Sequence, residues 1–286
     1  MRKSSKTYFL YTLFLAFFSV ASAQENTSIT DSISAEKEHR LTFSVDLVNR
    51  YIWRGQSWGG DYPVVQPTIE YAPCDKLTFG IWGTSNFKNE YYYDDGETAP
   101  KGYQELDLYV KYHFTKYIAL GLWDFYWPSV SKEEGIDNSF FNYGTNSVQT
   151  LSAELDFDFT ESDFPFHATI STLIGGNDYR YDEDGENPKQ NYTTYAELGY
   201  IFTVFKNFQI NPIVGAVFNN KAQYYTAGDY DRISFVNTNV ELSRTFHLGC
   251  SFEMTPFVNY THNGATKNTE AFGKNFVTFG VSLLRF

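Results

Sequence analysis

Apolar and polar residues alternate along most of the chain with a period of two, the pattern of a β-strand that has one apolar face. In segment 103–114, Leu106 and Leu108 share one face, while Glu105 and Asp107 share the other. A face this charged cannot be a dry core, because an unpaired buried charge is costly. We therefore expect the charged faces to line water and the apolar faces to meet lipid.

Twelve such runs can be marked. They are longer than ordinary strands of about five or six residues, and they reach the length of about nine to eleven that a tilted strand needs to cross a bilayer. The runs cover residues 41–56, 62–73, 76–87, 103–114, 117–127, 147–159, 166–175, 191–202, 208–218, 232–246, 251–260 and 272–286.

The connections between the runs alternate in length. Tight turns such as Cys74-Asp75 and Thr115-Lys116 alternate with long polar loops such as residues 88–102. Short turns at one rim and long loops at the other are typical of outer-membrane barrels, and an open sheet edge cannot be satisfied in hydrocarbon. The sequence predicts an all-β fold, a closed antiparallel transmembrane β-barrel of about 12 strands. A soluble exported β-sandwich is the alternative, and it would stay in solution without detergent.

Aromatic residues gather where the runs end, as at the two interfaces of a membrane barrel. The rim with the short turns would carry Tyr112, Phe114, Tyr117, Phe159, Phe164, Phe166, Tyr200, Phe202, Phe205, Phe208 and Phe246. The rim with the long loops would carry Tyr51, Trp53, Phe87, Trp127, Tyr192, Phe218 and Tyr260.

The first residues have the features of a secretory signal peptide. Cations precede a short apolar run, and small residues at 21–23 suggest cleavage before Gln24. We expect a signal peptide at 1–23, a disordered periplasmic lead-in at 24–40 and an outer-membrane barrel at 41–286. The net charge of −12 argues against a nucleic-acid partner. No mature segment has the run of about 18 apolar residues that a membrane helix needs.

The chain ends on an aromatic residue, Phe286. We expect the last run to pair with the first and close the barrel. A final strand ending in an aromatic residue also resembles the signal that bacterial barrel-assembly machinery reads, so we expect that machinery and outer-membrane lipid as partners. Cys74 and Cys250 fall in turns several strands apart, too far to form a disulfide, and we predict two unpaired thiols.

The predicted inner faces are acidic. They carry ten acidic and four basic residues, which would favour small cations over anions in a pore. In the alternative, these groups pair with one another across a narrow, plugged interior. The predicted pore-lining residues are Asp46, Arg50, Arg54, Glu70, Glu105, Asp107, Lys111, Glu154, Asp156, Glu197, Glu241 and Glu253, to which Lys76 and Asp158 add one charge each.

These patterns predict a porin-like channel for passive diffusion of small solutes or ions, with a weak cation preference. The alternative is a non-conducting barrel whose loops 89–101 and 177–190 bind a surface ligand or partner. No cofactor is expected. The loop 182–186 offers carboxylates to calcium without the spacing of an EF-hand. The chain has no G-x-S-x-G motif, and we expect no enzymatic activity.

Residues 49–87 carry a more specific pattern. An aromatic-rich strand ends in Arg54-Gly55, a Pro-x-x-Gln step follows at Pro63 and Gln66, and a Gly-x-Trp-Gly strand begins at Gly80. This segment resembles the start of the TorF-like porin family of Gram-negative bacteria. The resemblance implies an outer-membrane β-barrel and covers about forty residues well. The segment departs from the family pattern at residues 56–58 and at Gln66-Pro67.

Overall fold

The computed structural model of the chain describes residues 40–88, 102–128, 135–181, 184–219, 222, 225, 233–265 and 273–285, all within one compact unit at 38–286. The predicted signal peptide and nearly all of the lead-in lie outside the described residues. Their boundaries therefore stay predictions.

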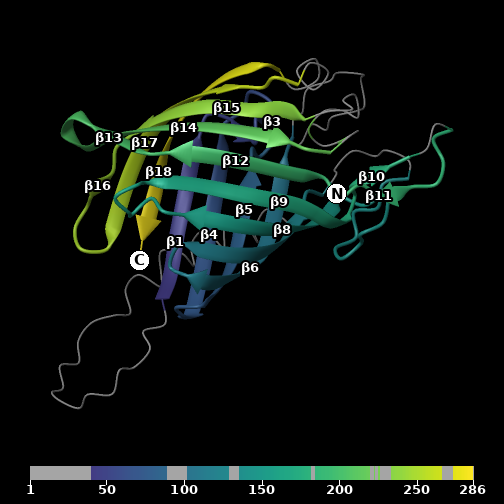
Figure 1. Cartoon of the computed structure of the whole chain (residues 1–286), viewed down its shortest axis with the longest axis horizontal. Helices are drawn as coiled ribbons and strands as arrows, with labels where there is room; N and C mark the ends of the chain where they lie inside the picture. Colours follow the sequence, from purple (N-terminus) through teal and green to yellow (C-terminus); the bar gives the residue numbers. More distant parts are fainter. Residues whose placement is uncertain are drawn as a thin grey trace, which may run out of the picture. The chain divides into compact units, whose positions relative to one another are not determined.

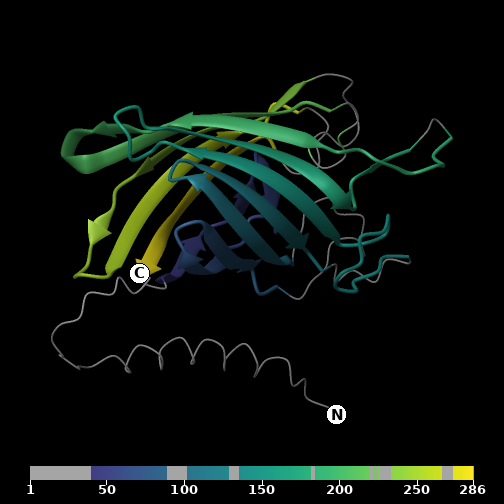
Figure 2. The same cartoon turned by 60° about the horizontal axis from the view of Figure 1, so that its bottom comes forward.

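The strands form a closed antiparallel ring, as predicted (Figures 1 and 2). The last strand of the chain pairs with the first from Phe43↔Arg285 to Val48↔Gly280, so no edge of the sheet is left open. Phe286 lies outside the described residues. The ring runs through twelve strands, β1 (Arg40–Val48), β4 (Val64–Cys74), β5 (Leu77–Ser85), β6 (Gln104–Thr115), β7 (Ile118–Tyr126), β8 (Gln149–Asp158), β9 (Phe166–Gly176), β12 (Thr194–Tyr200), β14 (Phe208–Val217), β15 (Ser234–Ser243), β17 (Phe252–His262) and β18 (Asn275–Arg285).

The connections alternate in length around this ring. Tight turns join pairs such as β4–β5 and β6–β7 at one rim, and long loops join the others at the opposite rim. No described helix is long and apolar enough to span a membrane. The short elements within the connections are β2 (Tyr51–Trp53), β3 (Gln56–Trp58), β10 (Tyr179–Arg180), β11 (Lys189–Gln190), β13 (Phe202–Val204), η2 (Phe205–Asn207) and β16 (Phe246–His247).

The two faces of the ring differ in polarity. The outer face exposes large apolar side chains, among them Leu47, Phe79, Leu122, Leu198 and Phe279. Polar side chains such as Asp107, Ser152 and Glu154 are buried on the inner face. In β7, where both faces are apolar in sequence, Leu120 and Leu122 are exposed while Trp123 and Phe125 line the lumen. The fold therefore presents an apolar exterior and a polar interior.

One predicted strand is shorter than expected. The run 41–56 does not continue through the wall, because β1 ends at Val48 and residues 51–58 pair only with each other, as the separate two-stranded sheet β2–β3. Tyr51 and Trp53, which we expected at the outer aromatic rim, instead pack inside the ring. Tyr51 lies against the rings of Trp82 and Tyr103, at centroid distances of 5.5 and 5.7 Å.

Aromatic residues at the rim with the short turns form a continuous chain of ring contacts. Tyr117 stacks on Phe159, and Phe159 stacks on Phe166, both at 4.6 Å between centroids. Phe164 then links Phe166 to Tyr200. This is the arrangement expected for side chains anchored at a membrane interface.

Glycine makes room for a large side chain on the inner wall. Gly80 pairs with Tyr109 across β5 and β6, and a Cβ atom at Gly80 would lie only 1.9 Å from the Tyr109 ring. Tyr109 lies flat on this glycine, stacks on Trp123 at 4.0 Å between centroids and donates a hydrogen bond to Glu70. A larger residue at position 80 would force the Tyr109 ring away from this part of the wall.

The two cysteines are unpaired, as predicted. Cys74 is partly buried at the end of β4, and Cys250 is exposed in the turn before β17.

Candidate functional site

A short hairpin, residues 51–58, is folded into the lumen; we call it the lumenal hairpin. Trp53 pairs with Gln56, so its turn consists of only Arg54 and Gly55, both with positive φ, at 47° and 85°. Two consecutive positive φ angles define the type I′ turn that suits tight hairpins. Glycine is required at position 55, because a Cβ atom there would lie 2.0 Å from the carbonyl oxygen of Val236.

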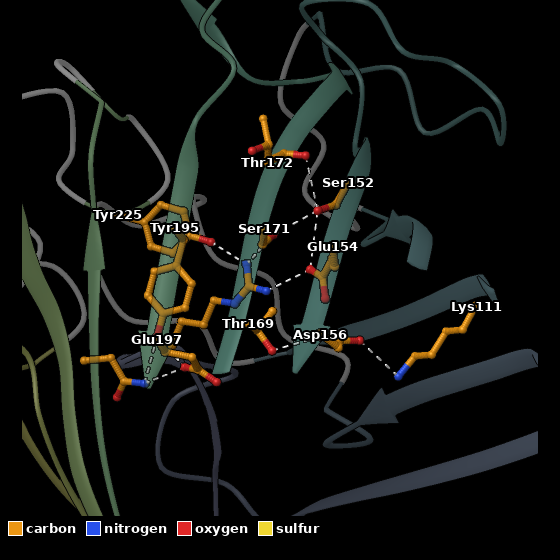
Figure 3. Close-up of polar contacts among 12 residues, drawn as sticks. Lys111, Ser152, Glu154, Asp156, Thr169, Ser171, Thr172, Tyr195, Glu197 and Tyr225 are labelled. Atoms are coloured by element: carbon orange, nitrogen blue, oxygen red, sulfur yellow. Dashed lines mark hydrogen bonds and ion pairs between the residues drawn. The ribbon is translucent and has the colours of Figure 1, made fainter. Parts of the chain in front are cut away.

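Arg54 fastens the tip of the hairpin to the far wall. Its guanidinium donates hydrogen bonds to Glu154 Oε1 at 2.8 Å and to Ser171 Oγ at 3.0 Å. It also lies over the ring of Tyr195, 4.6 Å from the centroid. Figure 3 shows these partners on neighbouring strands of the wall. Because β9 lies halfway around the ring from β1, Arg54 contacts the wall opposite the strand from which its hairpin departs.

Tyr225 adds a contact to this network from the loop between β14 and β15. Its hydroxyl accepts a hydrogen bond from Arg54 at 2.8 Å, and its ring stacks on those of Trp53 and Tyr195. Burial raises the pKa of Tyr225 to about 12, so the hydroxyl is neutral at physiological pH. The positive charge of Arg54 is therefore balanced by Glu154, not by a tyrosinate.

Further contacts, beyond those of Arg54, hold the lumenal hairpin in place inside the ring. Asn263, just after β17, donates a hydrogen bond to the Gly55 carbonyl at 3.0 Å. Gln56 and Ser57 are buried. Tyr51 packs against β5, and Arg54 binds to β8 and β9. The lumenal hairpin therefore reaches across the inside of the ring and narrows the lumen.

A cavity of about 410 Å³ adjoins the hairpin; we call it the lumenal chamber. Its charged lining consists of Asp46, Arg50, Arg54, Asp107, Glu154 and Glu241. A much smaller cavity of about 30 Å³ is lined mainly by aromatic rings, including Trp58, Tyr103 and Trp127.

Six of the predicted site residues thus meet around the lumenal chamber. Arg50 and Arg54 do not line the pore from the first wall strand, as the run 41–56 predicted, because that strand ends at Val48. Arg50 instead pairs with the exposed Asp61 at 2.7 Å, and Arg54 pairs with Glu154.

The other six predicted residues make local pairs away from the chamber lining. Lys111 lies 3.7 Å from Asp156, which accepts a hydrogen bond from Thr169 (Figure 3). Lys76 is exposed in a turn, not lumenal. The remaining pairs are Glu70 with Tyr109, Glu105 with Tyr103, Glu197 with Tyr195 and Glu253 with His247.

The predicted pore-lining residues are all charged, so the prediction did not include the uncharged residues of the chamber. Asn237, Asn239 and Glu241 follow one another at every second position of β15, and Asn259 and Thr261 do so in β17. This spacing of two places them on one face, so the same alternation that revealed the carboxylates could have revealed the amides.

The described residues include no group of three or more His, Cys, Asp or Glu side chains arranged to hold a metal ion. Asp182 and Glu183 of the suggested calcium loop lie outside the described residues, as do loop 89–101 and part of loop 177–190.

Similarity to known proteins is low in sequence. A family model described as "Bacterial protein of unknown function (Gcw_chp)" matches residues 32–209. No curated protein matches the chain.

Several solved outer-membrane structures are similar over most of the chain. The COG4313 outer membrane channel from Pseudomonas putida F1 has 9% identity and a TM-score of 0.46, over 91% of this chain and 99% of that one. LpxR from Salmonella typhimurium has 9% identity and a TM-score of 0.43, over 86% and 99%. OprB from Pseudomonas putida has 11% identity and a TM-score of 0.36, over 87% and 93%.

Proposed function

The chain belongs to the Gcw_chp family, and we propose that it is an outer-membrane channel for passive diffusion of small solutes and ions, narrowed by the lumenal hairpin. The observation that carries this proposal is the lumenal chamber, a polar cavity inside a closed ring whose outer face is apolar. A ring with this polarity suits lipid outside and water inside. The resemblance of residues 49–87 to TorF-like porins favours the same function.

The outer face favours a location in the outer membrane. Exposed leucine, valine and phenylalanine side chains recur on strands all around the ring, far more than a soluble monomer exposes in one belt. The aromatic chain from Tyr117 to Phe202 lies at one rim of that belt. The predicted signal peptide would provide export, and the strand that closes the ring would be recognised by the assembly machinery.

The charges of the chamber favour cations weakly. Its lining has four carboxylates and two arginines. Arg54 and Arg50 both make ion pairs, one with Glu154 in the lining and the other with Asp61 outside it. Asp46 and Glu241 are partly exposed to the chamber and have no such partner among the described basic residues, so the field of their carboxylates attracts cations and repels anions.

We expect the reversal potential in a KCl gradient to show this preference in planar bilayers. The double variant Asp46→Asn/Glu241→Gln removes two of the unpaired carboxylates, so its reversal potential should shift toward zero. The control variant Glu161→Gln/Asp163→Asn removes the same charge from an exposed turn. It should keep the wild-type value, because solvent and salt screen charges that far from the lumen. A wild-type preference for chloride would contradict the proposal.

A further inference from the structure

The lumenal chamber has the size and lining of a ligand site, and we infer that it binds a neutral, polyhydroxylated solute such as a sugar. This inference rests on the proposed channel function and adds the class of solute. The volume of the lumenal chamber, about 410 Å³, is within the range of about 300–1,000 Å³ found for small-molecule sites.

Five residues of the chamber lining have a buried polar atom without a hydrogen-bond partner among the described residues. These atoms are Arg50 Nε, Asp107 Oδ1, Trp123 Nε1, Asn239 Oδ1 and Thr278 Oγ1. Native proteins contain few such atoms, and a group of them around one cavity calls for an explanation. Each atom belongs to a residue that lines the chamber, and a bound solute that reaches it would supply the missing partner.

Donors and acceptors alternate around the chamber. In ring order the unpartnered atoms are the donor of Arg50, the acceptor of Asp107, the donor of Trp123 and the acceptor of Asn239, followed by the Thr278 hydroxyl, which can do both. A simple cation cannot accept a hydrogen bond from the two donors, and a simple anion cannot donate one to the two acceptors. A hydroxyl donates and accepts, so a solute with hydroxyls around its whole edge matches every one of them.

The apolar part of the lining fits the same solute. Trp82, Trp123 and Phe257 present aromatic rings to the chamber. The face of an aromatic ring carries negative charge density, which attracts the C–H groups on the face of a sugar ring. Anionic solutes are disfavoured because the lining has four acidic residues and only two arginines. The chamber therefore combines flat apolar faces with an alternating polar edge.

Binding is measured by titrating the refolded, detergent-solubilised full-length chain with D-glucose and following tryptophan fluorescence, since two tryptophans line the chamber in addition to Trp53 of the hairpin. We expect a saturable change. Thr278→Val removes an unpartnered hydroxyl with little change of shape. Asn239→Leu removes the unpartnered Oδ1 together with the Nδ2, which donates a hydrogen bond to Asn237. Each should raise the dissociation constant about 3- to 10-fold, the effect of losing one hydrogen bond.

Matched controls are Thr255→Val and Asn211→Leu, on the inner wall outside the chamber lining, where each side chain pairs with a neighbour. Their glucose affinity should equal that of the wild type. Equal weakening in the controls, saturable binding of arginine hydrochloride or sodium glutamate in place of glucose, or no glucose response in a chain that conducts ions would each overturn the inference. Because the titration needs no ion flow, a chain that binds glucose without conducting would refute the channel proposal alone.

Discussion

Arg54→Ala is expected to raise the single-channel conductance severalfold, because it removes the contacts that fasten the lumenal hairpin to the opposite wall. The lost contacts include the 2.8 Å hydrogen bond to Glu154 and the 3.0 Å bond to Ser171. The substitution also leaves Glu154 without its cation, and because Glu154 lines the water-accessible chamber the cost should be below the roughly 3–5 kcal/mol of a dry site. We therefore expect lower stability together with the higher conductance.

The double variant Arg54→Ala/Glu154→Gln separates these two effects. It frees the hairpin without leaving an unpaired carboxylate, so conductance should stay high while much of the stability returns. Arg244→Ala is the control, because Arg244 lies over the rings of Phe208 and Phe246 and outside the chamber lining. Its conductance should stay close to the wild-type value. Planar-bilayer recordings in which Arg54→Ala and Arg244→Ala behave alike would contradict the role of Arg54.

Leu122→Arg is expected to destabilise the folded barrel by about 2–4 kcal/mol, because it places a charge on the lipid face near the bilayer midplane. Leu122 is at the centre of β7 and is 49% exposed on the outer face. Asn259→Arg, on the inner face of β17, should cost much less, since Asn259 lines the water-accessible chamber. Urea unfolding in phospholipid vesicles measures both. A larger loss for Asn259→Arg would reverse the assignment of the two faces.

The ring itself was predictable from the sequence. Two patterns in the sequence depend on local chemistry alone. One is the period of two in segments such as 103–114, and the other is the alternation of turn and loop lengths. Both follow from a strand that separates water from lipid. In β7 the period failed to show which side faces inward, because Leu122 and Trp123 are both large and apolar. Only the register with β6 and β8 decides that question.

The lumenal hairpin was not predictable in the same way. The apolar alternation runs on through Tyr51 and Trp53, so the pattern continues past the point where β1 leaves the wall. The contacts that hold the hairpin come from Glu154, Ser171 and Asn263. These residues are 100, 117 and 208 positions along the chain from their partners in the hairpin. One local signal was present in the sequence. Gly55, Gly59 and Gly60 mark positions that favour positive φ and a turn.

The most direct test of the central claim is the single-channel conductance of the wild-type chain beside a variant in which residues 51–58 are replaced by a short Gly-Ser linker. A polar lumen inside a twelve-strand ring, narrowed by an inward hairpin, predicts small discrete current steps for the wild type. It predicts much larger steps for the variant, provided that both fold and insert equally well. Refolded, inserted barrels that pass no current in either form would contradict it.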